Sequence, residues 1–337
     1  MGYSIDVYRG TIKAERSFLT YALFVSFFPQ LVAGPIERAK NLLPQFHVEH
    51  QFNADDFIEG IKQMIWGFFM KLCIADCLYP YVDAVYNNIQ NHNGLSLILA
   101  TIFFTFQIYC DFAGYSNIAI GAARIMGFRL MQNFRQPYFA ISIKEFWKRW
   151  HISLSTWFMD YLYIPMGGNR VNYGRYLLNL MITFIVSGLW HGANWTFVIW
   201  GALHGTYLIL ESLTKQLTNA TQNKSIISKV ISTTLCFLLV SFAWIFFRAN
   251  SIEDAFAIVG KIFTEWGPLF TDKEAFLYGF AGLLILLIKD TKDNFGLRLN
   301  FMHSKFTLVR HASVVILISY ILLFGALSGG AFIYFQF

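Results

Sequence analysis

The chain has few charged residues: Asp, Glu, Lys and Arg make up only 14% of its 337 residues, whereas 56% are hydrophobic and 18% are aromatic. This balance excludes an ordinary soluble globular domain and indicates a protein whose solvent is largely lipid. The formal net charge of +6 does not indicate nucleic-acid binding, because the basic residues lie between apolar runs and not in one stripe.

Several motifs that would carry other chemistries are also lacking. The sequence contains no glycine-rich phosphate loop, no GxSxG nucleophile elbow and no HExxH or paired-cysteine metal motif. Covalent serine and zinc mechanisms are therefore poorly supported, and we expect no metal site and no bound cofactor. The four cysteines are expected to be small buried hydrophobes and not a disulfide framework. Because the opening segment MGYSIDVYRG has no basic stretch followed by an apolar one, we expect internal helices to direct membrane insertion.

What the sequence does contain is a series of long uncharged runs. A membrane-spanning helix needs roughly 20 mainly apolar residues, and several of the runs reach that length. We predict an all-α, polytopic membrane protein with about seven to nine membrane-embedded helices, folded as a single domain over residues 1–337. The runs are residues 18–34, 95–110, 176–190, 195–210, 230–247, 275–288 and 312–337.

The loops between these runs differ in charge. Residues 9–16, 124–149, 215–229 and 289–310 are rich in Lys and Arg, whereas residues 87–94 and 191–194 carry neither. The positive-inside rule therefore predicts that the basic loops lie on the cytoplasmic side and the uncharged loops on the opposite side.

Residues 141–161 form a different kind of segment. Apolar and aromatic residues recur there at steps of three and four, with charged residues between them, which predicts an amphipathic helix on the membrane surface. The following residues, 164–169, read IPMGGN and predict a turn back toward the bilayer.

His191 is the first candidate for chemistry. It lies in SGLWHGANW, between two apolar runs barely long enough to cross the bilayer and return, so the turn is expected to be sunk below the surface. Trp190 and Trp195 flank it with bulk expected to exclude water. An ionisable residue at that depth is a functional hypothesis by default, although a hydrogen bond to a neighbouring helix or an exposed hairpin tip is supported equally by position alone.

Two other histidines and an aspartate need weighing. His151 is expected beside the apolar stripe of the amphipathic segment, where it could share a cavity with His191, although an interfacial role is favoured for it alone. His204 is interpreted as a helix-packing residue. Asp111 is the only charged residue between Leu95 and Ala123, so it either lines a path or holds helices together, and the second interpretation is favoured. Lys71 and Asp76 allow the same interpretations, and both could also simply lie near an interface.

Several sequence blocks, in order, resemble the membrane-bound O-acyltransferase family, specifically its bacterial branch that includes alginate O-acetyltransferases. The blocks are SFFPQLVAGPIERA (26–39), YCDFAGYSNIAIG (109–121), FWKRWHISLSTWF (146–158), DYLYIPMGGNR (160–170), GLWHGANWTFVIWGALHG (188–205) and the terminal FIYFQF. The resemblance implies that His191 is catalytic and that His151 is its companion. Family members usually begin with further membrane helices, so the chain is expected to be truncated at its N-terminus relative to them.

The resemblance also implies the reaction. An acyl group, from acetyl-CoA or an acylated carrier in the cytoplasm, would be moved toward hydroxyls of an extracytoplasmic polysaccharide, with an exported partner acetyltransferase completing the transfer. The protein would be a multi-pass component of the bacterial inner membrane, in contact with lipid and not with nucleic acid. We expect the substrate to be contacted by Trp150, Trp190, Asn194 and Asp111.

Other functions stay open at this stage. Within the same chemistry, the acceptor could be peptidoglycan, or the acyl group could be D-alanine transferred to teichoic acid. In a different class, a channel or transporter would use Asp111, Asn117 and His191 as pore residues.

Overall fold

A computed structural model describes residues 1–31, 33–218, 225–272, 275–297 and 301–327, and every regular element within these ranges is a helix. The predicted all-α class is confirmed, and the terminal block FIYFQF lies outside the described residues. The α-helices are α1 (Gly2–Tyr8), α2 (Phe18–Ser26), α3 (Ala39–Leu42), α4 (Ala54–Phe68), α5 (Asp76–Tyr86), α6 (Gly94–Ile125), α7 (Ile143–Arg149), α8 (Ile152–Phe158), α9 (Tyr173–His191), α10 (Trp195–Thr218), α11 (Ile226–Arg248), α12 (Ile252–Thr264), α13 (Phe280–Phe295) and α14 (Thr307–Phe324).

Four of the described helices are long and apolar enough to cross a membrane: Ala54–Tyr86, Gly94–Ile125, Ile226–Arg248 and Thr307–Phe324. Two of them contain runs that the sequence predicts as membrane helices, 95–110 and 230–247, and Thr307–Phe324 overlaps a third, 312–337. The apolar run 18–34 instead gives the short helix α2, which ends at Ser26 and is followed by a 3₁₀ turn, Phe28–Gln30, with Pro29 in its first turn. Proline lacks the N–H that an α-helix would need there.

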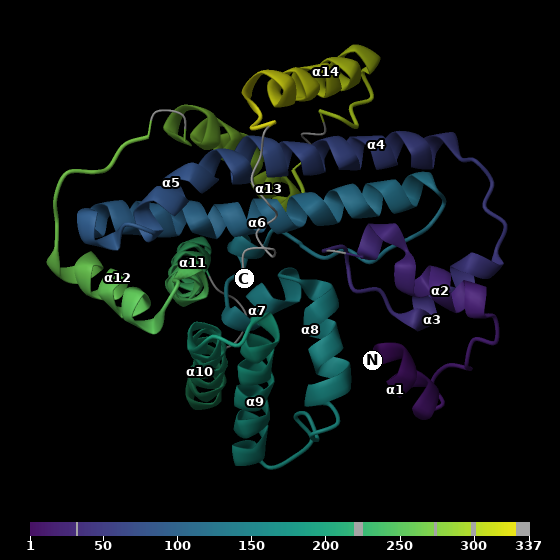
Figure 1. Ribbon diagram of the computed structural model, residues 1–337, viewed down its shortest axis with the longest axis horizontal. Coiled ribbons are helices and arrows are strands. Elements are labelled where there is room, and N and C mark those ends of the chain that lie inside the picture. The colour runs from purple at the N-terminus through teal and green to yellow at the C-terminus, as the bar shows by residue number, and fades with distance from the viewer. Residues whose placement is uncertain (32, 219–224, 273–274, 298–300, 328–337) are drawn as a thin grey trace.

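The helix over Ala54–Tyr86 was not expected from the sequence. It consists of α4, a π-helical segment (Phe69–Ala75) and α5, and it lies antiparallel to α6 across the molecule (Figure 1). The sequence does not predict this helix, because Lys71 and Asp76 interrupt the uncharged pattern that identifies the other membrane helices. Both side chains are largely enclosed by the protein: the Lys71 Nζ atom is 2.8 Å from Asp76 Oδ1 and 2.6 Å from Asp111 Oδ1 on α6. Paired charges can be tolerated at a depth where single ones cannot.

Helices α9 and α10 form a hairpin that packs against α11, and α11 in turn contacts α6 (Figure 1). In the same view the short helix α7 lies between this hairpin and α6, and α8 runs alongside α9. The hairpin therefore joins the long helices through α11 and α7, and its tip carries His191.

The prediction that residues 141–161 form one continuous amphipathic helix was wrong. The segment is divided into α7, α8 and a π-helical turn (Met159–Tyr163), with the break at His151, whose φ of 42° is left-handed. Trp150 and His151 are consequently buried in the protein and do not lie on a surface stripe. The turn predicted at residues 164–169 is confirmed.

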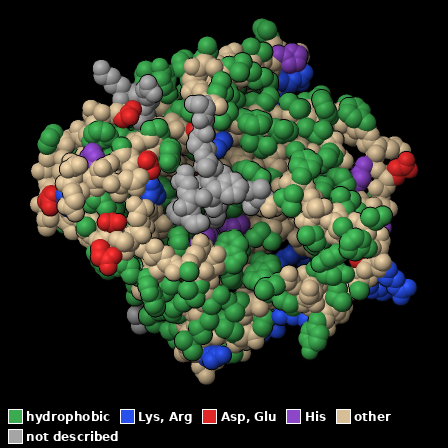
Figure 2. All heavy atoms as spheres, viewed as in Figure 1, with side chains coloured by type: hydrophobic (Ala, Val, Ile, Leu, Met, Phe, Trp, Pro, Cys, Tyr) green, Lys and Arg blue, Asp and Glu red, His purple; other side chains and the backbone are tan. Residues whose placement is uncertain are grey.

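Apolar side chains cover much of the surface, as Figure 2 shows for one face. Helix α14 is an extreme case, since Leu308, Val315, Ile316, Leu322 and Leu323 are each at least 60% exposed. A protein in water rarely exposes continuous apolar surface of this extent, whereas contact with lipid chains explains it.

Candidate functional site

His191 is the last residue of α9, and its partly buried imidazole is surrounded by aromatic rings. The ring centroids of Trp200 and Phe247 lie 5.2 Å and 5.1 Å from it, both nearly perpendicular, and Phe197 lies at 6.4 Å. These rings come from α10 and α11, so three helices build the environment of one imidazole. The ring is neither out in open solvent nor fully enclosed.

Close contact between the arms of the hairpin holds this position. A Cβ atom placed on Gly188 would collide with the main-chain carbonyl oxygen of Phe197, and one on Gly201 would collide with that of Phe184. Glycine at these two points lets the α9 and α10 backbones approach, as small residues do between membrane helices. The approach brings Phe197 and Trp200 beside His191.

The tryptophans that flank His191 in sequence both expose about half or more of their surface. The Trp190 ring is 5.1 Å from the imidazole but is 51% exposed, and Trp195 is 69% exposed. The apolar wall is instead formed by the buried Trp200 and Phe247. The buried indole N–H of Trp200 has no hydrogen-bond acceptor among the residues that the structure describes.

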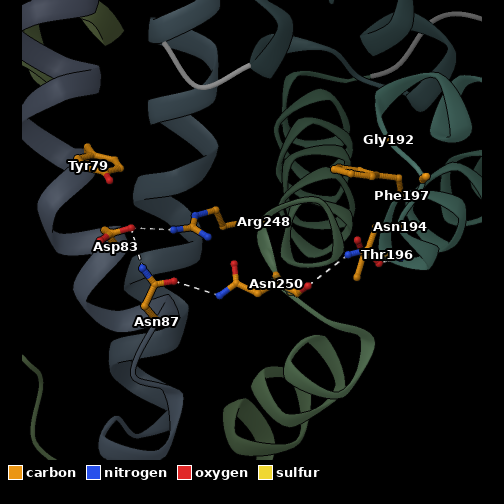
Figure 3. A pocket seen from close by; sticks show the side chains of 11 residues that line it. Tyr79, Asp83, Asn87, Gly192, Asn194, Thr196, Phe197, Arg248 and Asn250 are labelled. Atoms are coloured by element: carbon orange, nitrogen blue, oxygen red, sulfur yellow. Dashed lines mark hydrogen bonds and ion pairs between the residues drawn. The ribbon is translucent and has the colours of Figure 1, made fainter. Parts of the chain in front are cut away.

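A pocket of about 500 Å³ is lined by Gly192 and the other residues of the turn that follows His191 (Figure 3). Its wall includes the turn that follows His191 and the residues that follow Phe247, so it adjoins the aromatic environment of the imidazole. The lining residues are Tyr79, Asp83, Asn87, residues 192–194, Thr196, Phe197, Arg248, Ala249 and Asn250.

Polar side chains form a connected network across this pocket (Figure 3). Asp83 accepts hydrogen bonds from Arg248 at 3.1 Å and from Asn87 at 2.8 Å. Asn250 donates to the Asn87 side chain at 3.1 Å, and its main-chain carbonyl accepts from Asn194 at 3.2 Å. A pocket lined by amides and one ion pair offers donors and acceptors to a hydroxyl-rich ligand.

His151 lies close enough to His191 for the two imidazoles to interact electrostatically. It lies at the junction of α7 and α8, outside the four candidate membrane spans, and is 4% exposed. Burial, and then the neighbouring His191, lower the pKa of His151 well below its ordinary value, so its imidazole is neutral near pH 7. The Phe112 ring meets it edge-on with centroids 4.6 Å apart.

The other two predicted substrate contacts lie further from His191. Trp150 packs against Trp244 at 5.1 Å, Trp244 stacks on Trp200 at 5.8 Å, and Trp200 reaches His191. Asp111 forms the ion pair with Lys71 described above. Substrate contact by either residue stays a prediction, whereas Trp190 and Asn194 adjoin the imidazole and the pocket.

The described residues contain no group of His, Cys, Asp and Glu side chains that could hold a metal ion. The four cysteines, all within the described ranges, form no disulfide, and Cys73, Cys110 and Cys236 are buried as predicted.

Sequence reasoning missed three contributors to the site. Trp200 and Phe247 come from apolar helices in which nothing distinguishes them from core residues. Asn133, whose amide contacts His151, lies in the connection between α6 and α7. In the sequence, Asn133 is marked only as a polar residue in the partly basic connection that precedes the amphipathic segment 141–161.

Comparison with known proteins adds a family to this geometry. The model of the membrane-bound O-acyltransferase family matches residues 12–248, which include α2 to α11, both histidines and most of the pocket. The match thus covers most of the chain and the whole His191 hairpin.

Curated relatives agree with that match. The probable alginate O-acetylase AlgI of Azotobacter vinelandii is 44% identical over 269 residues, which are 79% of this chain and 52% of that protein. The peptidoglycan O-acetyltransferase of Helicobacter pylori is 39% identical over 72% of this chain and 46% of that protein. The teichoic acid D-alanyltransferase of Bacillus subtilis is 30% identical over 59% and 53%, respectively. The chain spans about half the length of these relatives.

Proposed function

The chain belongs to the membrane-bound O-acyltransferase family, and from that premise we propose that it carries an O-acyl transfer site centred on His191. The observation that supports this most directly is the position of the imidazole, which stands between an aromatic wall and a polar pocket and within electrostatic range of a second histidine. The acyl group is assigned as acetyl, which is moved onto an acceptor hydroxyl on its way toward the hydroxyls of an extracytoplasmic polysaccharide.

In the proposed reaction, acetyl-CoA or an acylated carrier presents its thioester to His191 from the side of α7 and α8. His191 takes the proton of the acceptor hydroxyl, whose oxygen forms a bond to the carbonyl carbon while the carbon–sulfur bond breaks. The departing thiolate then receives the proton from the imidazolium. General-base help of this kind supplies about 10² to 10⁴ in rate. His151, Trp190 and Asn194 orient the reactants, which further raises the rate.

The polar pocket is the proposed entrance for the acceptor. Its lining includes Asn87 and residues 192–194, which belong to the two loops that the charge distribution predicts to be outside the cell. The opposite end of α6 carries Arg124, which pairs with Asp56 near the predicted cytoplasmic surface. The two substrates would thus approach His191 from opposite sides of the membrane.

This arrangement requires more embedded segments than the four long helices. We propose that α9, α10 and the shorter apolar helices bring the total to about seven to nine and form a funnel around His191. The protein would act in the bacterial inner membrane, surrounded by lipid. An exported acetyltransferase would be the partner that completes transfer to the polysaccharide.

Two related reactions remain alternatives because of specific relatives. The Helicobacter pylori relative is named a peptidoglycan O-acetyltransferase, and the Bacillus subtilis relative a teichoic acid D-alanyltransferase. Both would use the same histidine on a different acceptor or acyl group. Mass spectrometry of surface polymers from cells with and without the gene separates the three.

The decisive experiment is replacement of His191 in the full chain. Membranes carrying wild type or His191→Ala are supplied with radiolabelled acetyl-CoA or an acylated carrier, and acetyl transfer to added hydroxyl acceptors is measured. We expect His191→Ala to lose at least about 100-fold in rate, the minimum for general-base help, with unchanged membrane insertion. His47→Ala serves as the matched histidine control, since His47 pairs with Glu15 far along the chain from the site.

Acetyl transfer retained by His191→Ala would refute the assignment of the base. Flux of an ion or solute through the reconstituted protein, in the absence of an acyl donor and of any acyl transfer, would instead support the channel or transporter alternative.

A further inference from the structure

Asn133 is a buried asparagine, 1% exposed, that connects three separate parts of the chain. Its main-chain carbonyl accepts a hydrogen bond from the N–H of Ile152 at 2.9 Å. Its side-chain Oδ1 accepts from the Ser153 N–H at 3.2 Å and from the Ser153 hydroxyl at 2.9 Å. Its Nδ2 donates to the Ser116 hydroxyl on α6 at 3.2 Å.

These bonds fix which way round the amide lies. The main-chain N–H of Ser153 can only donate, so the amide atom that faces it must be the oxygen. The same oxygen lies 3.1 Å from Nδ1 of His151. An amide oxygen can only accept, so Nδ1 must carry a hydrogen and donate it.

The protonation of Nδ1 determines the state of the other ring nitrogen of His151, Nε2. A neutral imidazole has one N–H, so a proton on Nδ1 leaves a lone pair on Nε2. The structure gives Nε2 of His151 no hydrogen bond to any described residue.

The backbone of His151 supports a specific role for this contact. Its φ of 42° is a conformation that a non-glycine residue adopts at a cost of about 1–3 kcal/mol. Both bonds from Asn133 to the first turn of α8 hold the chain in that conformation. Such strain persists where surrounding contacts determine it, and it occurs often at functional sites.

We propose that Asn133 is the positioning residue of the acyl-transfer site: it holds His151 as the Nδ1–H tautomer, with the Nε2 lone pair presented to the reactants beside His191. Asn133 itself touches neither substrate. The proposal rests on the proposed function, because it gives His151 the task of accepting a hydrogen bond from a reactant, which holds that reactant in place while His191 takes the proton of the reacting hydroxyl.

The test uses two substitutions in the full chain in membranes. Asn133→Ala removes the acceptor of the Nδ1 proton, and we expect kcat to fall about 10- to 100-fold, the range that loss of the hydrogen-bond partner costs a metal-binding histidine, with KM for the acyl donor nearly unchanged. Asn133→Asp keeps an acceptor at the same place, so it should retain most of kcat.

The carboxylate in Asn133→Asp adds a second, sharper signature. A negative charge on the Nδ1 side favours the imidazolium and raises the pKa of His151, so the acid limb of the pH–rate profile should move to higher pH by about one unit or more. The tautomer is read directly by ¹⁵N NMR of histidine-labelled protein, with the His151 signal assigned from its loss in His151→Gln.

A matched control distinguishes positioning from folding. Asn179 is also fully buried, and its amide donates to the main-chain carbonyls of Met166 and Gly168. Asn179→Ala should lower the yield of folded protein without moving the pH profile. If Asn133→Asp gives an unmoved acid limb, or if the NMR shows the Nε2–H tautomer in wild type, the positioning role is overturned. If His191→Ala stays active, the proposed function fails instead, whatever the Asn133 variants do.

Discussion

Replacing Lys71 by Met is expected to destabilise the protein strongly. The Lys71 ammonium lies 2.8 Å from Asp76 and 2.6 Å from Asp111, and both carboxylates are almost fully buried. Removing one partner of a buried ion pair leaves uncompensated charge and costs about 3–5 kcal/mol. At roughly 2 °C per kcal/mol, the low end for domains of 150–250 residues, the midpoint of thermal unfolding should fall by roughly 6–10 °C.

The measurement is thermal unfolding of the detergent-solubilised protein, followed as the fraction that remains monodisperse after heating. A control neutralises the whole cluster: Lys71→Met combined with Asp76→Asn and Asp111→Asn should recover part of the loss, because no charge then remains unpaired. Asp111→Asn alone tests its predicted substrate contact. If that variant loses more than about tenfold in kcat at an unchanged midpoint, Asp111 acts on substrate and the structural reasoning is refuted.

Two further changes probe the hairpin and the pocket. Gly188→Ala forces a methyl group against the Phe197 carbonyl, so we expect the free energy of unfolding to fall by about 1–3 kcal/mol and the activity to fall with it. Unaltered unfolding in detergent would contradict the close approach of the α9 and α10 backbones. Arg248→Ala removes the ion pair with Asp83 and the guanidinium above the Tyr86 ring. We expect KM for the hydroxyl acceptor to rise at least several-fold and KM for the acyl donor to stay unchanged. Equal rises in both KM values would place the pocket outside the acceptor route.

The sequence predicts those parts of the fold that depend on local pattern. Uncharged runs predict α6, α9, α10, α11 and α14, because a long apolar run identifies a membrane helix from the local sequence alone, without knowledge of what the helix packs against. The helix Ala54–Tyr86 escapes this reasoning, since its Lys71 also pairs with Asp111, which is distant in sequence. A pairing of this kind exists only in three dimensions.

The candidate site divides in the same way. The hairpin around His191 follows from two short apolar runs separated by a glycine-containing turn, and the second histidine follows from the resemblance. The break at His151 does not follow, because the periodic pattern of residues 141–161 continues through it. The left-handed backbone there depends on bonds from Asn133, which the chain supplies from the connection after α6.

The contacts of two buried histidines also explain why residue type alone does not identify a base. Trp147 donates its indole N–H to Nδ1 of His204 at 3.3 Å, so neutral His204 carries its proton on Nε2, which is buried without a partner among the described residues. Such a ring has no lone pair left to accept a proton from a substrate. His151 has the opposite arrangement, because its Nδ1 donates to Asn133 and Nε2 keeps the lone pair. One donor or acceptor placed against Nδ1 thus decides whether a buried histidine packs helices or can take part in proton transfer.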